Sequence, residues 1–201
     1  RGGMSSFSWH VDNPLTGKDS WDVSDSTVVK SVLPGGVNHD KFIGWLDKVA
    51  DYLNSIQTSE GVKVPVLFRP WHEHTGSWFW WGKNLCSTED YKALWTMTYD
   101  RLQEKGATQL LYAYSPGTEP KDSTEYLERY PGDDIVDLIG VDAYQFDKDA
   151  YVKSLDNALT IMSQVSKAHK KLMAVTETGY ETIPDSLWWT QTLMPVIEKY
   201  P

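Results

Sequence analysis

Residues 62–73 read VKVPVLFRPWHE, a short apolar run that ends in arginine, proline, tryptophan, histidine and glutamate. Such a run, bounded by polar or turn residues, is typical of a buried strand. Five segments of this kind are predicted as strands: 3–9, 62–68, 109–114, 136–142 and 172–176. Helical stretches lie between them. This alternation predicts repeated βα units around a mostly parallel sheet.

The stretches between the strands carry apolar residues at offsets of three and four, as amphipathic helices do. The clearest stripe is Phe42, Ile43, Leu46, Val49, Ala50, Leu53 and Ile56, and a second one is Val152, Leu155, Leu159, Met162 and Val165. Ser87 and Asp90 have the spacing of a capping box and predict a helix that ends near Gly106. A further helix is predicted over 185–199.

Two architectures share this alternation, a doubly wound open sheet and a closed eightfold barrel. No glycine-rich phosphate loop follows any predicted strand, which removes the main support for a nucleotide-binding open sheet. Polar and aromatic residues instead follow the strand ends, as at 9–10, 71–73, 114–115, 142–144 and 176–178. Barrel enzymes carry their chemistry at this edge. The pattern therefore favours the barrel.

Composition narrows the function. The chain has 201 residues, a formal net charge of -9, 10 Trp and 11 Tyr. The negative charge disfavours nucleic acid and anionic lipid as partners, and no apolar run is long enough to span a membrane. The four aromatic residues 78–81 cannot all point inward from one short loop, so we expect some of their rings to face a ligand. The single cysteine, Cys86, is expected to be a partly packed thiol.

Two carboxylic acids follow predicted strands in aromatic surroundings, Glu73 and Glu177. A carboxyl pair of this kind suits hydrolysis of a glycosidic bond, because one group must be protonated to release the leaving oxygen while the other stays ionised near the anomeric carbon. An isolated glutamate at a strand end more often makes a surface ion pair. The aromatic setting of both favours the catalytic interpretation.

The fourteen residues 69–82, RPWHEHTGSWFWWG, resemble the signature of glycoside hydrolase family 26. The resemblance continues through GGMSSFSWH at 2–10, GVDAY at 140–144 and TETG at 176–179. It implies an α/β fold, the (β/α)8 TIM barrel, and an endo-acting β-1,4-mannanase without a cofactor or metal. It also implies a retaining double displacement with Glu73 as acid/base and Glu177 as nucleophile.

The same resemblance implies a set of substrate-binding residues. His10, His72 and Trp78 would line the subsite of the sugar being cleaved, Tyr144 would hydrogen-bond the nucleophile, and Asp142 would support them. The residues themselves agree on one point, since Asp142 and Tyr144 are two apart and would share one side of an extended strand. For His10, a structural role with satisfied hydrogen bonds is the alternative.

Four positions have two alternative interpretations from the sequence. Trp21, Trp80 and Trp81 either line neighbouring subsites or pack against the barrel wall, and of these Trp21 and Trp81 are carried as substrate-binding candidates. Arg69 either holds a nearby glutamate in its ionised form or makes a structural ion pair.

Numbered by the family motifs, the five predicted strands are the third to the seventh of the barrel. Residues 1–201 are therefore expected to be part of a single glycoside hydrolase catalytic domain, with N- and C-terminal barrel units missing and with the helix over 185–199 following strand seven. The family implies a β-mannan polysaccharide or oligosaccharide as substrate, a monomer when complete, and a secreted, cell-surface or periplasmic location, although no signal-peptide pattern precedes Arg1.

Three rival functions are kept. The first is a β-glycan-binding protein that does no chemistry. The second is a metalloenzyme that uses His10, His72, His74 and Glu73, although the His-Glu-x-x-His spacing of zinc hydrolases is missing. The third is a family member that acts on mixed-linkage β-glucan or xylan.

Overall fold

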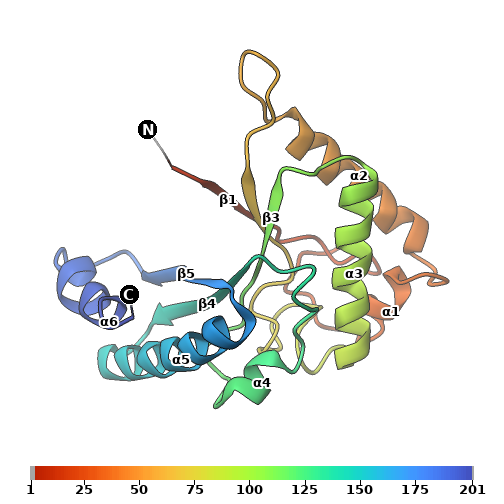
Figure 1. Ribbon diagram of the computed structural model, residues 1–201. Coiled ribbons are helices and arrows are strands. Elements are labelled where there is room, and N and C mark those ends of the chain that lie inside the picture. The colour runs from red at the N-terminus through yellow and green to blue at the C-terminus, as the bar shows by residue number, and fades with distance from the viewer. Residues whose placement is uncertain (1–2, 201) are drawn as a thin grey trace.

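Five parallel strands form one sheet in the computed structural model, which describes residues 3–200 (Figure 1). They are β1 (Ser5–Ser8), β2 (Val66–Arg69), β3 (Leu110–Tyr114), β4 (Leu138–Gln145) and β5 (Leu172–Tyr180). Each strand pairs with the next one along the chain, in the order β1-β2-β3-β4-β5. Sequential parallel strands joined by helical connections are the arrangement of a (β/α)8 barrel. The described residues supply five neighbouring strands of such a barrel.

The helices lie on the outer side of this sheet, with α2 and α3 beside the first strands and α5 beside the last two (Figure 1). They are α1 (Val28–Val32), α2 (His39–Ser55), α3 (Thr88–Glu104), α4 (Ser123–Leu127), α5 (Lys148–His169), the π-helix η1 (Trp189–Leu193) and α6 (Met194–Ile197). The stripe predicted for α2 is buried at Phe42, Leu46, Ala50 and Leu53. Among the described residues, none of the helices combines the length and the apolar character needed to cross a bilayer.

All five predicted strands are confirmed, but their ends differ from the prediction. β2 begins only at Val66, directly after Pro65, because proline has no N–H to give to a neighbouring strand. β4 and β5 run on to Gln145 and Tyr180, beyond the predicted ends at 142 and 176. Polar side chains on the inner face of a strand therefore look, in the sequence, like the start of a loop.

The predicted helix starts and ends are only partly confirmed. The Ser87 side chain caps α3 by accepting a hydrogen bond from the Asp90 N–H at 3.0 Å. The return bond of a capping box, from the Ser87 N–H to the Asp90 carboxylate, is not formed between these two described residues. The single helix predicted over 185–199 is wrong in extent, since only η1 and α6 form there. Pro195, in the first turn of α6, lacks the N–H that a continuous α-helix would need.

The aromatic run 78–81 mostly faces inward, while Trp78 and Phe79 also line a cleft of the protein, where a ligand could reach them. Phe79, Trp80 and Trp81 are fully buried, whereas Trp78 is only partly covered. The Trp81 ring stacks on Phe79 with centroids 4.5 Å apart. The Trp80 indole N–H donates to the Val11 carbonyl at 3.1 Å. Residues distant in the sequence cover these rings, which a short loop could not bury by itself.

Arg129, which follows α4, holds this aromatic loop in place. Its buried guanidinium donates hydrogen bonds to backbone carbonyls of the loop, those of His74, Trp81, Cys86 and Ser87. Its side chain makes no ion pair with a carboxylate in the range 3–200. The partly buried Cys86 thiol packs against the core beside it, as expected from the sequence.

Candidate active site

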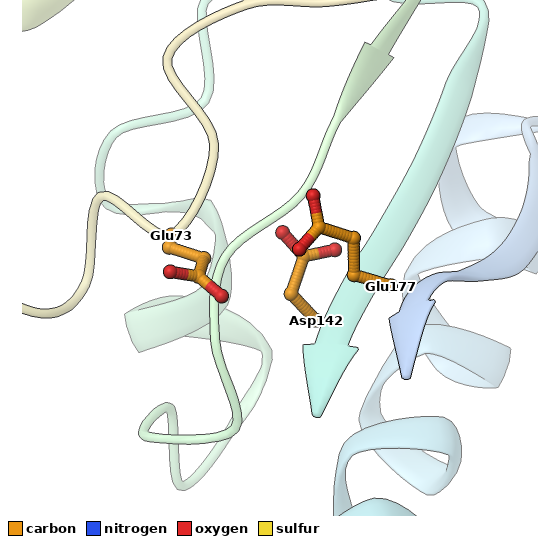
Figure 2. Close-up of side chains that lie close together, drawn as sticks. All are labelled: Glu73, Asp142 and Glu177. Atoms are coloured by element: carbon orange, nitrogen blue, oxygen red, sulfur yellow. The ribbon is translucent and has the colours of Figure 1, made fainter. Parts of the chain in front are cut away.

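Three carboxylates from different segments converge at the carboxyl ends of the strands (Figure 2). Glu73 lies on the loop after β2, Asp142 on β4 and Glu177 on β5. Each offers one oxygen, and these three oxygens all lie within 4.8 Å of one another. The meeting of Glu73 and Glu177, predicted from the sequence, is thus present in the structure.

The loop after β2 carries Glu73 in an unusual backbone conformation. Trp71 and Glu73 have φ angles of 55° and 53°, in the left-handed region that residues other than glycine rarely occupy. Each such residue costs on the order of 1–3 kcal/mol and persists only where its surroundings fix it. The Trp71 ring is fully buried, and the Glu73 N–H donates to the Ser115 carbonyl at 2.8 Å. These contacts hold the loop so that the Glu73 side chain faces the cleft.

Burial raises the pKa of Glu73 above the ordinary value of a glutamate. The Trp78 indole N–H, which donates to Glu73 Oε2 at 2.7 Å, works in the opposite direction by stabilising the anion, and the nearby charge of Glu177 raises the pKa again. A glutamate that keeps its proton to higher pH than usual is suited to act as a general acid.

Glu177 differs from Glu73 in its partners. The Arg69 guanidinium donates to Glu177 Oε1, and the Tyr144 hydroxyl donates to Oε2 at 3.0 Å. Burial raises the pKa of Tyr144 to about 12, so this phenol remains a hydrogen-bond donor at neutral pH. Both carboxylate oxygens are thereby engaged by donors, one of them cationic. A carboxylate held in this way is oriented for attack and compensated in charge.

Arg69 also pairs with Asp142, and both side chains are almost fully buried. Its Nη1 donates to Asp142 Oδ2 at 2.6 Å and to Ser115 Oγ at 2.9 Å, while Thr176 Oγ1 donates to Asp142 Oδ1 at 2.7 Å. Burial raises the pKa of Asp142 to about 7, and the Arg69 cation counteracts the rise. Arg69 therefore forms the structural ion pair considered from the sequence, and it also donates a hydrogen bond to Glu177.

Two histidines form a pair beside the carboxylates. His10 lines the cleft, and its Nε2 lies 3.0 Å from Nε2 of the fully buried His72. Burial lowers the pKa of His72 to about 2 and also lowers that of His10. Neutral rings can share one proton across this contact, one as donor and one as acceptor. His72 does not line the cleft, and its contact with the cleft is the hydrogen bond to His10.

The histidines do not assemble as a metal centre would require. His74 is buried between the rings of Tyr91 and Tyr114, with centroids 4.7 and 4.8 Å away. Within 3–200, the one group of ligand-type side chains close enough for a shared cation consists of the three carboxylates, without any histidine. Two of those carboxylates already accept from Arg69. The side chains present thus do not match the His-based set considered from the sequence.

The cleft around these groups has a volume of about 860 Å³. It is lined by His10, Trp21, Glu73, Trp78, Phe79, Gly117, Thr118, Glu119, Asp142, Ala143, Tyr144, Phe146 and Glu177. Of the residues expected at the site, His72 and Trp81 are absent from this lining. For Trp81 this corrects the expectation, because its ring is enclosed against Phe79 and its N–H donates to the His72 carbonyl at 2.8 Å.

Sequence reasoning missed two prominent lining residues, Glu119 and Phe146. Phe146 lies two residues beyond Tyr144, so the alternation that placed Asp142 and Tyr144 on one side could have been extended to it. Glu119 gave no comparable signal, because it lies on an irregular segment where side-chain direction has no period.

A parallel β/α sheet with two carboxyl groups facing each other in an aromatic cleft, at the carboxyl ends of its strands, is the arrangement of barrel glycoside hydrolases. The comparison with known families agrees: the family described as Glycosyl hydrolase family 26 matches residues 1–194. The chain belongs to this family.

Relatives with named functions are similar to most of the chain. A mannan endo-1,4-beta-mannosidase of Bifidobacterium adolescentis is 39% identical over 187 residues, which are 89% of this chain and 18% of that protein. A mannan endo-1,4-beta-mannosidase of Bacillus subtilis is 31% identical, over 100% of this chain and 54% of that protein. The structure of a GH26 beta-mannanase from Bacteroides ovatus superposes with a TM-score of 0.98 at 64% identity, covering 100% of this chain and 58% of the other. The chain thus covers between 18% and 58% of the length of these relatives.

Proposed function

We propose that the protein hydrolyses internal β-1,4 linkages of mannan, glucomannan or galactomannan by double displacement, with retention of configuration at the anomeric carbon. The observation that carries the proposal is the separation of the two glutamates, which bring carboxylate oxygens within 4.8 Å of each other. Retaining glycosidases hold their carboxyl groups about 5–5.5 Å apart, whereas inverting ones leave about 6.5–9.5 Å for a water molecule. The short separation supports direct attack by a carboxylate.

In the proposed first step, Glu177 attacks the anomeric carbon while Glu73 gives its proton to the oxygen of the departing sugar. In the second step, Glu73 takes a proton from a water molecule that attacks the same carbon and releases Glu177. The hydrogen bonds from Arg69 and Tyr144 orient Glu177 for attack. The raised pKa of Glu73 supports its role as the acid.

His10, Trp78 and Trp21 are proposed to contact the sugar. Trp78 lies in the cleft with its indole N–H on Glu73, which places its ring beside the bond to be broken. Trp21 is 58% exposed and packs on Phe79 with centroids 4.8 Å apart, so it can offer a flat apolar face to a pyranose. A cleft with carboxylates and aromatic rings suits a neutral sugar rather than an anionic one.

Mutation of each glutamate in the intact protein tests the mechanism. Glu177→Ala is expected to abolish release of reducing ends from mannan. Glu73→Ala is expected to do the same for mannan but to retain activity on an aryl β-mannoside whose leaving group needs no acid. Glu60→Ala, at an exposed glutamate remote from the cleft, is the matched control. Near-normal mannan hydrolysis by Glu177→Ala would refute the nucleophile assignment.

The polysaccharide preference is tested by incubating mannan, mixed-linkage β-glucan and xylan side by side with the intact enzyme. Mannan-derived oligosaccharides as the main products support the proposal, and the names of the relatives favour this outcome. A predominance of glucan or xylan products would show that the same mechanism acts on another polysaccharide.

Two other functions predict different results. A binding protein without chemistry would bind manno-oligosaccharides in a calorimeter but release no reducing ends. A metalloenzyme would lose activity with a chelator and regain it with zinc, whereas the two-carboxylate mechanism is indifferent to both.

Residues 1–201 are further proposed to be part of one catalytic domain that acts as a monomer and meets its polymer outside the cytoplasm. The size and insolubility of mannan favour such a location. Fractionation of the native cells and light scattering on the purified intact protein test these two points.

A further inference from the structure

Phe146 is exposed in a way that the fold itself does not require. It directly precedes Asp147, whose side chain caps α5 by accepting from the Ala150 N–H at 2.8 Å. An apolar residue just before a helix cap commonly packs against the fourth helical residue, here Tyr151. The Phe146 ring instead stays 93% exposed and stacks on no other aromatic ring within 3–200, while Tyr151 packs on Trp188. The ring lines the catalytic cleft.

Glu119 lines the same cleft and is tied to the loop that carries Glu73. The Thr75 hydroxyl donates to Glu119 Oε2 at 2.6 Å and in turn accepts from the Gly117 N–H at 3.0 Å. Thr75 lies two residues after Glu73, so the Glu119 carboxylate lies on the acid/base flank of the cleft. Its negative charge also contributes to raising the Glu73 pKa.

The ring and this carboxylate both line the cleft, and they lie beyond the ends of the neighbouring strands β3 and β4. In Figure 2, Glu73 lies between its own loop and the segment that follows β3, and Glu177 faces it from the other side. The oxygen protonated by Glu73 belongs to the departing sugar, so contacts on the Glu73 flank are available to that sugar.

We propose that Phe146 and Glu119 form a subsite for the departing sugar of the substrate, with the apolar face of a neutral hexopyranose on the Phe146 ring and its hydroxyls donating to the Glu119 carboxylate. This inference rests on the proposed glycosidase function and adds to it the side of the cleft that selects the leaving group. An aromatic face next to a fixed acceptor matches the two surfaces of a pyranose, its C–H face and its rim of hydroxyls.

The test compares two substrates in the intact enzyme. Mannopentaose has a departing sugar, whereas β-mannobiosyl fluoride releases only fluoride and places nothing in the proposed subsite. Phe146→Ala is expected to lower kcat/KM for mannopentaose about 3- to 10-fold and that for the fluoride by less than about 2-fold. Phe146→Tyr keeps a ring and is expected to restore the mannopentaose value. Glu119→Ala is expected to show the same split between substrates, with the alkaline limb of its pH profile moved to lower pH.

Tyr52→Ala is the matched control, since Tyr52 is an aromatic residue of α2 that is 57% exposed outside the cleft. It is expected to change neither substrate. Equal losses on both substrates for Phe146→Ala, a loss on the fluoride alone, or no loss on either would overturn the subsite. If the unsubstituted enzyme cleaved neither substrate, the proposed function itself would fail and this inference with it, an outcome distinct from an active enzyme with unchanged selectivity.

Discussion

Replacing Arg69 by methionine should destabilise the protein far more than an ordinary surface charge change. Arg69 is almost fully buried and pairs with Asp142, also buried, and with the partly buried Glu177. Removing one partner of a buried ion pair costs about 3–5 kcal/mol, because the other charge stays in the interior without compensation. For a domain of this size, that loss lowers Tm by roughly 6–20 °C.

The loss of stability should depend on pH, and the direction of this dependence follows from the raised pKa of Asp142. Burial raises the folded-state pKa of Asp142 from 3.8 to about 7. A raised carboxyl pKa means that the folded state binds the proton more tightly, so stability declines as the pH rises through this window. Without the Arg69 cation, the Asp142 pKa rises further and the decline continues to higher pH. Arg69→Met should therefore cost more stability at about pH 8 than at about pH 5.

Thermal unfolding of the intact protein at both pH values measures this effect. Arg101→Met is the matched control, since Arg101 pairs with Asp47 through two hydrogen bonds of 2.7 and 2.9 Å at the surface. A partly exposed pair contributes about 0–1 kcal/mol, and the Asp47 pKa is lowered by the Arg101 hydrogen bond, so no titration occurs between the two pH values. A loss for Arg69→Met no larger than the control, or equal at both pH values, would refute the reasoning.

Three further outcomes are expected. The kcat/KM for mannan should fall as the pH rises through the raised pKa of Glu73, so the alkaline limb of the pH profile should lie above the usual glutamate range. This limb should be absent for a substrate with a fluoride leaving group, which needs no acid. An alkaline limb at the ordinary glutamate pKa would contradict the effect of burial. Tyr144→Phe removes the donor to Glu177 and should lower kcat roughly 10-fold with little change in KM, whereas a rise in KM alone would indicate a substrate contact instead. Ser87→Ala should cost about 1 kcal/mol in urea unfolding through loss of the α3 cap, and Ser87→Asp, which retains an acceptor, should not.

The sequence predicted the strands and the meeting of Glu73 with Glu177 because both depend on local pattern. Short apolar runs reveal buried strands, and the residues that follow them must gather at one edge of a parallel sheet. The predicted ends of two strands came too early, since β4 ends with the buried Gln145 and β5 continues through Glu177, and polar groups of this kind resemble a loop in the sequence.

The burial of the aromatic loop could not be predicted in the same way. Trp80 and Trp81 are enclosed by partners from other parts of the chain, such as Phe42 and Trp71, and no local period reports such contacts. Glu119 was missed for a related reason, because its place in the cleft depends on a hydrogen bond to Thr75, 44 residues earlier in the chain.

The guanidinium of Arg129 sets a condition on protein engineering. A designer who grafts the segment from Trp71 to Ser87 onto another barrel, to import its acid, would copy a loop whose carbonyls point at a cation encoded elsewhere. Without that cation the buried carbonyls would lack hydrogen-bond donors, and the loop would no longer hold the Glu73 side chain toward the cleft. The transferable unit is therefore the loop together with the arginine of the neighbouring βα repeat.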